Sequence, residues 1–532
     1  MINPLFNIDF YKAGHRQQYP EGTEMVYSNF TPRSSRLFNG SKYFDDKVVV
    51  FGIQAFIEEF LVSEWDAYFF SEKKEDVVAE YKALMDASLG PDAIPVDHVE
   101  ALHDLGYLPL EIRALPEGTR APMKVPVLTI RNTIPEFFWL VNYLESVMSA
   151  ELWGPMTSAT IAFEYKRILT QAAIDTGAPV DFVPLQAHDF SFRGMSSRET
   201  AMKMGMGHLT SFIGTDTVPA IAYAKDIYGT TDENDPIGVS VPATEHSVMC
   251  MGTKDGEIET FRRLINELYP TGIVSIVSDT WDFWQVVTEY LPKLKDDIMA
   301  RKPNAIGLNK VVIRPDSGDP VHIICGYDHR EVVYFDGYGW AKKKDCYIDP
   351  DPCDIYYQLP EGDYKFLTDH EVKGAIQCLW ETFGGIETDE DFRILDEHIG
   401  LIYGDSITMS RAQEIVDRLA DKGFASTNVV FGVGSYTYQF NTRDTFGFAM
   451  KATAGVVNGE HREIFKDPAT DSGVKKSARG YLRVDKKDGE YVLTDQCDGL
   501  QYDDAMEIVF LNGETFNQST FDEIRNRLQE EL

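Results

Sequence analysis

The feature that most constrains this chain is a run of β-branched residues that ends abruptly in charged and turn-forming ones. Val311-Val312-Ile313 is followed at once by Arg314-Pro315-Asp316-Ser317-Gly318. A short apolar run rich in Val and Ile is typical of a buried parallel strand. Proteins of the α/β class keep their ligand sites at the carboxyl ends of such strands. The run therefore predicts a cation, a carboxylate and a tight turn at a ligand-binding edge.

The same pattern recurs along the chain at the spacing of strand–helix units. Strands are expected over 238–242 before Glu245-His246, over 274–278 before Asp279, over 400–404 before Asp405, and over 428–431 before Gly432-Val433-Gly434-Ser435. Further strands are expected over 183–188, before Gly214-Thr215-Asp216, and after Lys451. This count approaches the roughly eight strands of a closed barrel. The sequence therefore predicts an α/β fold with an irregular (β/α) barrel and one polar rim.

The strand and helix patterns divide the chain into three segments. Residues 1–180 are mixed α/β, with strands expected at 24–30 and 109–115 and helices at 53–63, 73–88, 135–150 and 157–173. Residues 181–440 carry the barrel, interrupted at 320–372 by short alternating runs that predict an antiparallel excursion. Residues 441–532 are more polar and end in a charged helix.

The charge balance restricts the partners. The chain has 85 acidic and 50 basic residues, a formal charge of −35. Such a surface repels nucleic acid and anionic membranes, so neither is expected as a partner. An anion site must instead be built locally from Arg, Lys and backbone N–H groups. No signal peptide is evident at the N-terminus, and residues 137–148 are too short an apolar helix to span a bilayer.

The six cysteines show neither a CxxC pair nor a zinc spacing with histidines. Cys346 and Cys353 are near enough in sequence to invite a bridge, but a reduced, cytoplasmic protein is the simpler interpretation.

Three acids stand at three separate strand ends. If the barrel closes, Asp279, Asp316 and Asp405 converge, and clustered carboxylates there suggest Mg²⁺ bound together with substrate phosphates. The alternative is three independent helix caps. In the same way Glu245 could orient the imidazole of His246 and raise its basicity, although most histidines are structural.

Three further motifs have both a functional and a structural interpretation. In the segment 188–194, Phe190 could stack a planar ring and Arg193 could hold a phosphate, or the aromatics could be core. Asp216 could bind a ligand or cap a helix. The 431–435 segment could cradle a phosphate with exposed N–H groups, although a lone GxGS is weak evidence.

Taken in order, these segments resemble the nicotinamide phosphoribosyltransferase family. The likeness is carried by residues 9–20, 116–118, 188–190, 196–201, 214–218, 241–246, 277–279, 313–318, 442–444, 465–468 and 521–525. The resemblance implies a type II phosphoribosyltransferase: an irregular α/β barrel plus an α+β domain built from both chain termini. It implies the reaction of nicotinamide with phosphoribosyl pyrophosphate, giving nicotinamide mononucleotide and pyrophosphate with Mg²⁺. It also implies a homodimer with shared active sites.

The resemblance assigns roles by position. Phe190 and Tyr11 look like the pair that sandwiches the nicotinamide ring, with Tyr11 coming from the other subunit. Asp216 resembles the acceptor of the carboxamide N–H. His246 matches the histidine that ATP phosphorylates in the family, so ATP is expected as an activating co-substrate.

The remaining roles concern phosphates and the metal. Arg193 and Arg314 resemble cations near the ring and phosphate, and Asp279, Asp316 and Asp405 resemble the acids around ribose, pyrophosphate and Mg²⁺. The phosphate, pyrophosphate and ribose sites are expected to use Arg33, Arg314, Gly404, Asp405, Gly434, Ser435, Arg443 and Lys451. Arg33, Arg443 and Lys451 are expected to act partly across the dimer.

Departures from the family pattern are Thr244 and Ser435, where alanine and glycine are expected, and a long 320–372 segment. Ser406 and Ile407 also follow Asp405 where the family has glycine.

Two other functions remain open. Nicotinate phosphoribosyltransferases share the architecture, and Asp216 is the discriminator because a carboxylate accepts a bond from an amide but repels a second carboxylate. A catalytically inactive barrel acting in binding or signalling is the alternative from another class.

Overall fold

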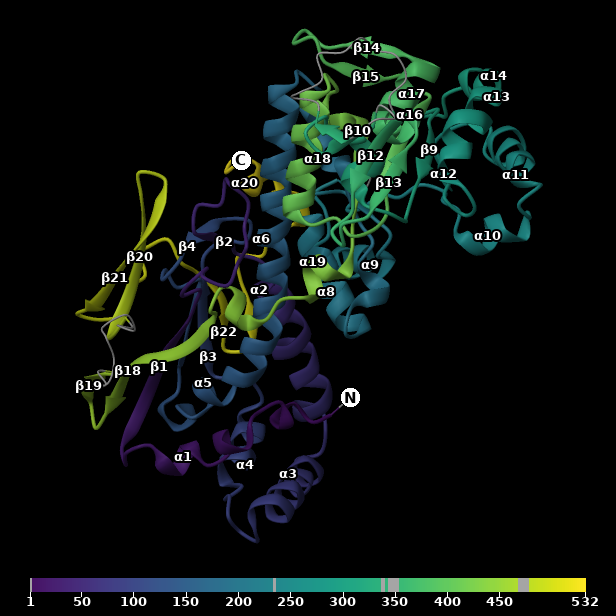
Figure 1. Cartoon of the computed structure of the whole chain (residues 1–532). Helices are drawn as coiled ribbons and strands as arrows, with labels where there is room; N and C mark the ends of the chain where they lie inside the picture. Colours follow the sequence, from purple (N-terminus) through teal and green to yellow (C-terminus); the bar gives the residue numbers. More distant parts are fainter. Residues whose placement is uncertain (1, 233–235, 336–339, 343–353, 467–477) are drawn as a thin grey trace.

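The computed structural model describes residues 2–232, 236–335, 340–342, 354–466 and 478–532. A six-stranded parallel sheet and a seven-stranded antiparallel sheet form two separate regions. The 31-residue helix α6 (Glu145–Asp175) runs between these regions and packs against both (Figure 1). The structure is thus mixed α/β, as the strand pattern predicts.

The parallel sheet has the order β7-β6-β17-β16-β9-β8. Its strands are β6 (Ala187–Asp189), β7 (Gly214–Thr215), β8 (Val274–Val277), β9 (Val311–Arg314), β16 (Ile399–Tyr403) and β17 (Val429–Val433). Isolated parallel bridges join Val239 to Gly214 at one edge and Ala243 to Ser275 at the other. The segment from Val239 to Ala243 therefore contacts both edge strands, β7 and β8, and the sheet curves like part of a barrel.

Three expected strands differ. The 238–242 segment forms only those isolated bridges, because Pro242 has no N–H to donate to a ladder. Residues Val183–Gln186 form the short helix α7, with Pro184 in its first turn, where proline favours helix initiation. The strand containing Lys451 is β18 (Ala449–Val457), which lies in the antiparallel sheet.

The antiparallel sheet has the order β19-β18-β1-β5-β3-β22-β23. Its other strands are β1 (Thr23–Thr31), β3 (Leu110–Ala114), β5 (Leu128–Asn132), β19 (Glu460–Glu463), β22 (Glu507–Leu511) and β23 (Glu514–Thr515). The register pairs Thr31 of β1 with Ala449 of β18. Strands from both ends of the chain therefore share one sheet and one apolar core.

The helices expected at 135–150 and 157–173 are largely one helix, since α6 continues through Pro155. Helix α3 (Lys74–Leu89) matches the expected 73–88, and α2 (Ile53–Phe56) opens the helical stretch expected at 53–63. In the described ranges, no helix has the length and apolar character needed to cross a membrane.

The excursion after β9 forms a four-stranded antiparallel sheet of order β11-β10-β12-β13. Its strands are β10 (Val332–Phe335), β11 (Trp340–Lys342), β12 (Asp354–Gln358) and β13 (Tyr364–Leu367). Arg418 of α18 (Met409–Asp421) pairs with Glu331 at 2.6 Å and ties this sheet to the parallel region. Cys346 and Cys353 lie outside the described residues, and the four described cysteines are unpaired.

The remaining elements are short. They are α1 (His15–Gln18), β2 (Lys47–Val49), α4 (Asp97–Leu105), β4 (Arg120–Pro122), α5 (Leu140–Tyr143), α8 (Arg198–Leu209), α9 (Val218–Ile227), α10 (His246–Met251), α11 (Glu257–Arg263), α12 (Phe283–Gln285), α13 (Leu291–Lys293), α14 (Lys295–Met299), α15 (Pro320–Cys325), α16 (Asp369–Lys373), α17 (Ala375–Phe383), β14 (Gly385–Glu387), β15 (Arg393–Leu395), α19 (Ser435–Gln439), β20 (Tyr481–Lys487), β21 (Glu490–Cys497) and α20 (Phe521–Gln529).

Candidate active site

The residues that directly follow the six parallel strands form what we term the carboxyl edge. Most of the predicted site residues stand there: Phe190 and Arg193 after β6, Asp216 after β7, Asp279 after β8, Arg314 and Asp316 at the end of β9, Gly404 and Asp405 after β16, and Gly434 and Ser435 after β17. His246 follows the bridged segment, on the same side of the sheet. The sheet order therefore brings together residues that are up to about 250 positions apart in sequence.

Asp279 is the central anchor of the edge. Its side chain is only 4% exposed. One oxygen, Oδ2, accepts hydrogen bonds from the main-chain N–H of Asp316 at 2.8 Å and from the Ser317 hydroxyl at 2.7 Å. The other oxygen, Oδ1, lies 3.3 Å from Nε2 of His246. Asp279 thus fixes the turn after β9 and holds the histidine.

The partner of His246 differs from the one that the sequence suggested. Glu245 has an extended backbone at the N-cap of α10, and its carboxylate accepts the hydroxyl of Ser247. The imidazole of His246 is instead oriented by Asp279, a residue 33 positions away. Half of the histidine side chain remains exposed, so a phosphoryl donor can reach it.

The three acids expected at a metal do not form a preassembled cluster. Within the described ranges, no group of three His, Cys, Asp or Glu side chains is placed to hold a metal ion. The carboxylate of Asp279 already accepts hydrogen bonds from Asp316 and Ser317. The carboxylate of Asp316 accepts no hydrogen bond from the described residues. Asp405 is exposed, and the Ser406 hydroxyl is its one hydrogen-bond donor among the described residues. Two available carboxylates suit Mg²⁺, which takes one or two of them together with substrate phosphates.

Arg314 and Gly404 lie next to Asp316 at the carboxyl edge. The Nη2 of Arg314 donates to the carbonyl of Thr244 at 2.8 Å, while its Nε is buried without a hydrogen-bond partner in the described part of the chain. Gly404 lies against Asp316, since an added Cβ would stand 2.6 Å from Oδ1. A larger residue at 404 would displace the Asp316 carboxylate. The guanidinium retains donors for an incoming anion.

Phe190 offers an aromatic face at the same edge. Its main-chain N–H donates to the Val433 carbonyl at 2.9 Å, and its ring lies over Gly432. A Cβ on Gly432 would stand 2.5 Å from Phe190 Cδ2, so the glycine provides the space for the ring. The His188 ring lies beside it, with centroids 4.9 Å apart.

Asp216 is held by two donors. Its Oδ1 is 2.9 Å from Nε2 of His188 and 2.6 Å from the Ser240 hydroxyl. Burial raises the pKa of this carboxyl, but the bonds from His188 and Ser240 and the charge of Arg314 outweigh it, and the net pKa is lowered. Asp216 is therefore ionised at neutral pH. His188 and Ser240 received no role from the sequence, although His188 precedes Phe190 by two and shares its strand face.

The segment expected to bind a phosphate leads from β17 into helix α19. Gly434 is the N-cap of α19, and Ser435 is its first residue. Gly194 lies directly against Ser435, because an added Cβ would stand 2.0 Å from Oγ. The exposed Arg193 is therefore a neighbour of this loop, and both can contact one phosphate.

Four expected site residues lie elsewhere in a single chain. The Nε of Arg33 donates to the Gly447 carbonyl at 2.7 Å, close to Arg443, and Lys451 lies on β18 of the antiparallel sheet. Tyr11 is 59% exposed in the segment just before α1, and α1 lies far from β9 in Figure 1. Among the described residues, the Tyr11 ring contacts His15 and Lys12 and not the carboxyl edge.

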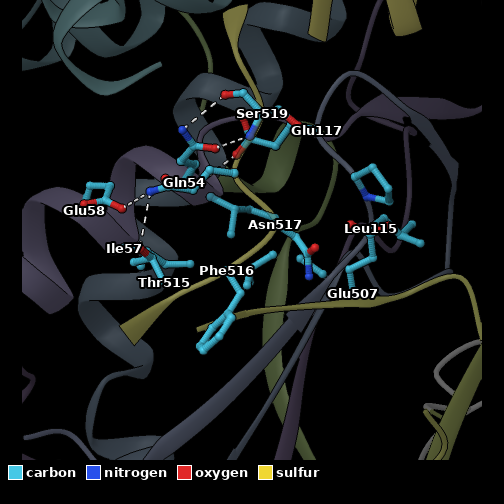
Figure 2. Close-up of a pocket in the computed structure, with 15 residues that line it drawn as sticks. Gln54, Ile57, Glu58, Leu115, Glu117, Glu507, Thr515, Phe516, Asn517 and Ser519 are labelled. Carbon is cyan, nitrogen blue, oxygen red and sulfur yellow. Dashed lines mark hydrogen bonds between the residues drawn. The ribbon is translucent and has the colours of Figure 1, made fainter. Parts of the chain in front are cut away.

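The pocket drawn in Figure 2 lies away from the carboxyl edge. It lies between α2 and the 507–519 segment, and none of the predicted site residues line it. Its polar groups are satisfied internally: Glu117, whose pKa is raised by burial, accepts from the main-chain N–H of Gln54 and from Tyr228. The side-chain oxygen of Gln54 accepts from the main-chain N–H of Ser519. This pocket lies where the 507–519 segment packs against α2, and its hydrogen bonds hold that segment in place.

Comparisons with known proteins identify the family of this chain. Residues 185–514 match the nicotinate phosphoribosyltransferase (NAPRTase) family, and residues 3–84 match the nicotinamide phosphoribosyltransferase N-terminal domain. The nicotinamide phosphoribosyltransferase of Acinetobacter baylyi is 57% identical over all of this chain and 98% of the relative. That of Xanthomonas campestris pv. campestris is 31% identical, covering 98% of this chain and 97% of the relative.

A solved structure shows the same fold. The nicotinate-nucleotide pyrophosphorylase from Pyrococcus furiosus aligns over 99% of this chain and 95% of its own, with a TM-score of 0.52 and 13% identity. At that identity the likeness concerns the fold alone. Full-length identity to the curated relatives, together with the two family matches, shows that this chain belongs to the nicotinamide phosphoribosyltransferase family.

Proposed function

We infer that this protein is an enzyme that transfers the phosphoribosyl group of phosphoribosyl pyrophosphate to nicotinamide, releasing pyrophosphate and forming nicotinamide mononucleotide for NAD salvage. The observation that carries the choice of substrate is Asp216. Its carboxylate is held ionised through Oδ1, and its other oxygen accepts no hydrogen bond from the described residues. A free carboxylate oxygen accepts the N–H of an amide and repels a carboxylate.

The reaction is a displacement at the anomeric carbon through an oxocarbenium-like centre. Phe190 positions the pyridine ring and Asp216 fixes its rotation, so the ring nitrogen faces the ribose. Arg314, Arg193 and the N-terminus of α19 at Ser435 are placed to bind phosphate oxygens. Asp316 and Asp405 would hold Mg²⁺ together with the substrate, and the ion would supply positive charge against the leaving pyrophosphate.

ATP acts as an activating co-substrate by phosphorylating His246. This proposal is supported by the exposure of the imidazole and by its contact with Asp279, which orients it.

The active unit is a homodimer with shared sites. Tyr11, Arg33, Arg443 and Lys451 come from the second chain, which is supported by the exposure of Tyr11 before α1 and by its ring contacts with His15 and Lys12. Three aromatic side chains near the carboxyl edge are exposed in the single chain: Phe192 by 40%, Tyr436 by 65% and Phe440 by 75%. Exposed apolar groups of this kind support a surface that the second chain covers.

The proposed architecture is that of a type II phosphoribosyltransferase. Residues 181–440 form the barrel, and residues 1–180 and 441–532 form a composite α+β domain, supported by the antiparallel sheet that joins both chain ends. We place the enzyme in the cytoplasm, consistent with the unpaired thiols of Cys325 and Cys378.

The test is a product assay with nicotinamide and nicotinate side by side. Purified protein with phosphoribosyl pyrophosphate and Mg²⁺ should form the mononucleotide from nicotinamide and hardly any from nicotinate. Equal or better use of nicotinate would indicate that the protein is a nicotinate phosphoribosyltransferase. Absence of product from either base would favour an inactive binding barrel.

A further inference from the structure

We propose that His188 is a positioning residue that fixes the carboxylate of Asp216 and thereby sets the preference for an amide over a carboxylate substrate. The inference rests on the function proposed above and deepens it. It assigns specificity to a pair of residues on neighbouring strands, β6 and β7, and not to the aspartate alone.

The sheet leaves His188 little freedom. The residue pairs with Gly214 of β7 on one side and with Gly432 of β17 on the other. A Cβ on Gly214 would stand 2.9 Å from Nδ1 of His188, so a larger residue at 214 would press on the imidazole. On its other side, the His188 ring lies beside the Phe190 ring, with centroids 4.9 Å apart. The imidazole is therefore fixed between the stacking ring and Asp216.

Both donors to Asp216 meet the same oxygen. Nε2 of His188 and the Ser240 hydroxyl lie 2.9 and 2.6 Å from Oδ1. Oδ2 receives no hydrogen bond from the described residues, and the side chain is 45% exposed. Two bonds on one oxygen fix the rotation of the carboxyl group and direct Oδ2 toward the site. A substrate amide can donate to Oδ2, whereas a substrate carboxylate meets a like charge.

The other groups around this pair are the Phe190 ring beside His188 and Arg314 near Asp216. A proton on Nε2 of His188 is donated to Oδ1, so the imidazole holds this oxygen in place and leaves Oδ2 as the acceptor for the substrate.

The experiment measures kcat and KM for nicotinamide and for nicotinate at neutral pH. His188→Gln places an amide N–H near the position of Nε2, so it should keep most of the wild-type preference for nicotinamide. His188→Ala should lower the preference on the order of tenfold, mainly through a higher KM for nicotinamide.

The matched control is His398→Gln. His398 also contacts an aspartate, Asp396, at 2.7 Å, but it stands just before β16, at the opposite end of the parallel sheet. This variant should behave as the wild type. If His188→Ala keeps the wild-type ratio, or if His188→Gln loses the preference as fully as His188→Ala does, the positioning role is wrong while the proposed function stands. If the wild type forms no mononucleotide from nicotinamide, the proposed function itself fails.

Discussion

Nε2 of His246 lies 3.3 Å from Oδ1 of Asp279, whose second oxygen is fixed by the main-chain N–H of Asp316. This contact favours the tautomer with its proton on Nε2, which leaves the lone pair of Nδ1 as the nucleophile. We expect ATP to leave an acid-labile phosphate on Nδ1, seen by phosphorus NMR, and to raise turnover. His246→Ala should abolish the label and Asp279→Asn should weaken it. A label that persists in His246→Ala would place the phosphate elsewhere.

Asp216→Asn removes the negative charge and gives the site an amide. Use of nicotinate should rise, and kcat/KM for nicotinamide should fall by about tenfold, because the charge-assisted acceptor is lost. The measurement is the pair of specificity constants at neutral pH. Asp417→Asn on α18 is a control remote from the carboxyl edge and should leave the ratio unchanged. An unchanged ratio in Asp216→Asn would refute the role of this aspartate.

Gly432→Ala should act on nicotinamide more than on the phosphoribosyl donor. The new Cβ would stand 2.5 Å from the Phe190 ring and 2.8 Å from the Tyr403 carbonyl, so the ring must move. We expect the KM for nicotinamide to rise on the order of tenfold, with a smaller change for phosphoribosyl pyrophosphate. Gly499→Ala, where the added atom meets nothing within 4 Å, is the control. Equal increases in both KM values would show a general distortion instead.

Subunit complementation tests the shared site. Tyr11→Ala and Asp316→Ala homodimers should each be nearly inactive. After subunit exchange, about half of the dimers are mixed and each has one intact site of two, so activity should recover to about a quarter of wild type. If exchange is demonstrated by mass and activity stays absent, Tyr11 serves its own chain and the shared-site proposal is wrong.

Glu257 should make stability depend on pH. The residue is 1% exposed, its Oε1 has no hydrogen-bond partner in the described part of the chain, and burial, with Asp282 nearby, raises its pKa to about 7 from 4.5. A carboxyl whose folded pKa is raised contributes its full stability below the unfolded pKa and loses it as pH rises through the folded one.

Glu257→Gln should therefore stabilise the protein at pH 8, on the order of 2 kcal/mol, and much less at pH 5. Denaturant unfolding at both pH values measures the difference. Glu259→Gln, on the exposed face of the same helix, is the control. A gain of the same size at both pH values would show that ionisation is not its cause.

The carboxyl edge could be predicted from sequence because its signal is local. A β-branched run followed by Arg314 and Asp316 identifies both the strand and its polar end, and parallel strands align such ends on one side. The strand expected over 183–188 was right only for its last two residues, which begin β6, because residues 183–186 form α7 with Pro184 in its first turn. The strand expected over 238–242 was wrong, since this segment forms isolated bridges around Pro242.

Contacts between strands were not predictable in this way. The partner of His246 is Asp279, 33 residues away, and not the adjacent Glu245, because sequence adjacency says nothing about where a side chain points at an N-cap. The bonds from His188 and Ser240 to Asp216 likewise depend on register.

The pairing of β1 with β18 has a consequence for how the chain is made. Thr31 and Ala449 are partners across 418 residues, so the β18-facing side of β1 is unpaired until almost the whole chain has been synthesised. An open strand edge in an incomplete chain can pair with other molecules, and such long-range pairing forms slowly. Chains that stop before residue 449 should therefore aggregate during synthesis, and chaperones that cover exposed strands should be needed most at this stage.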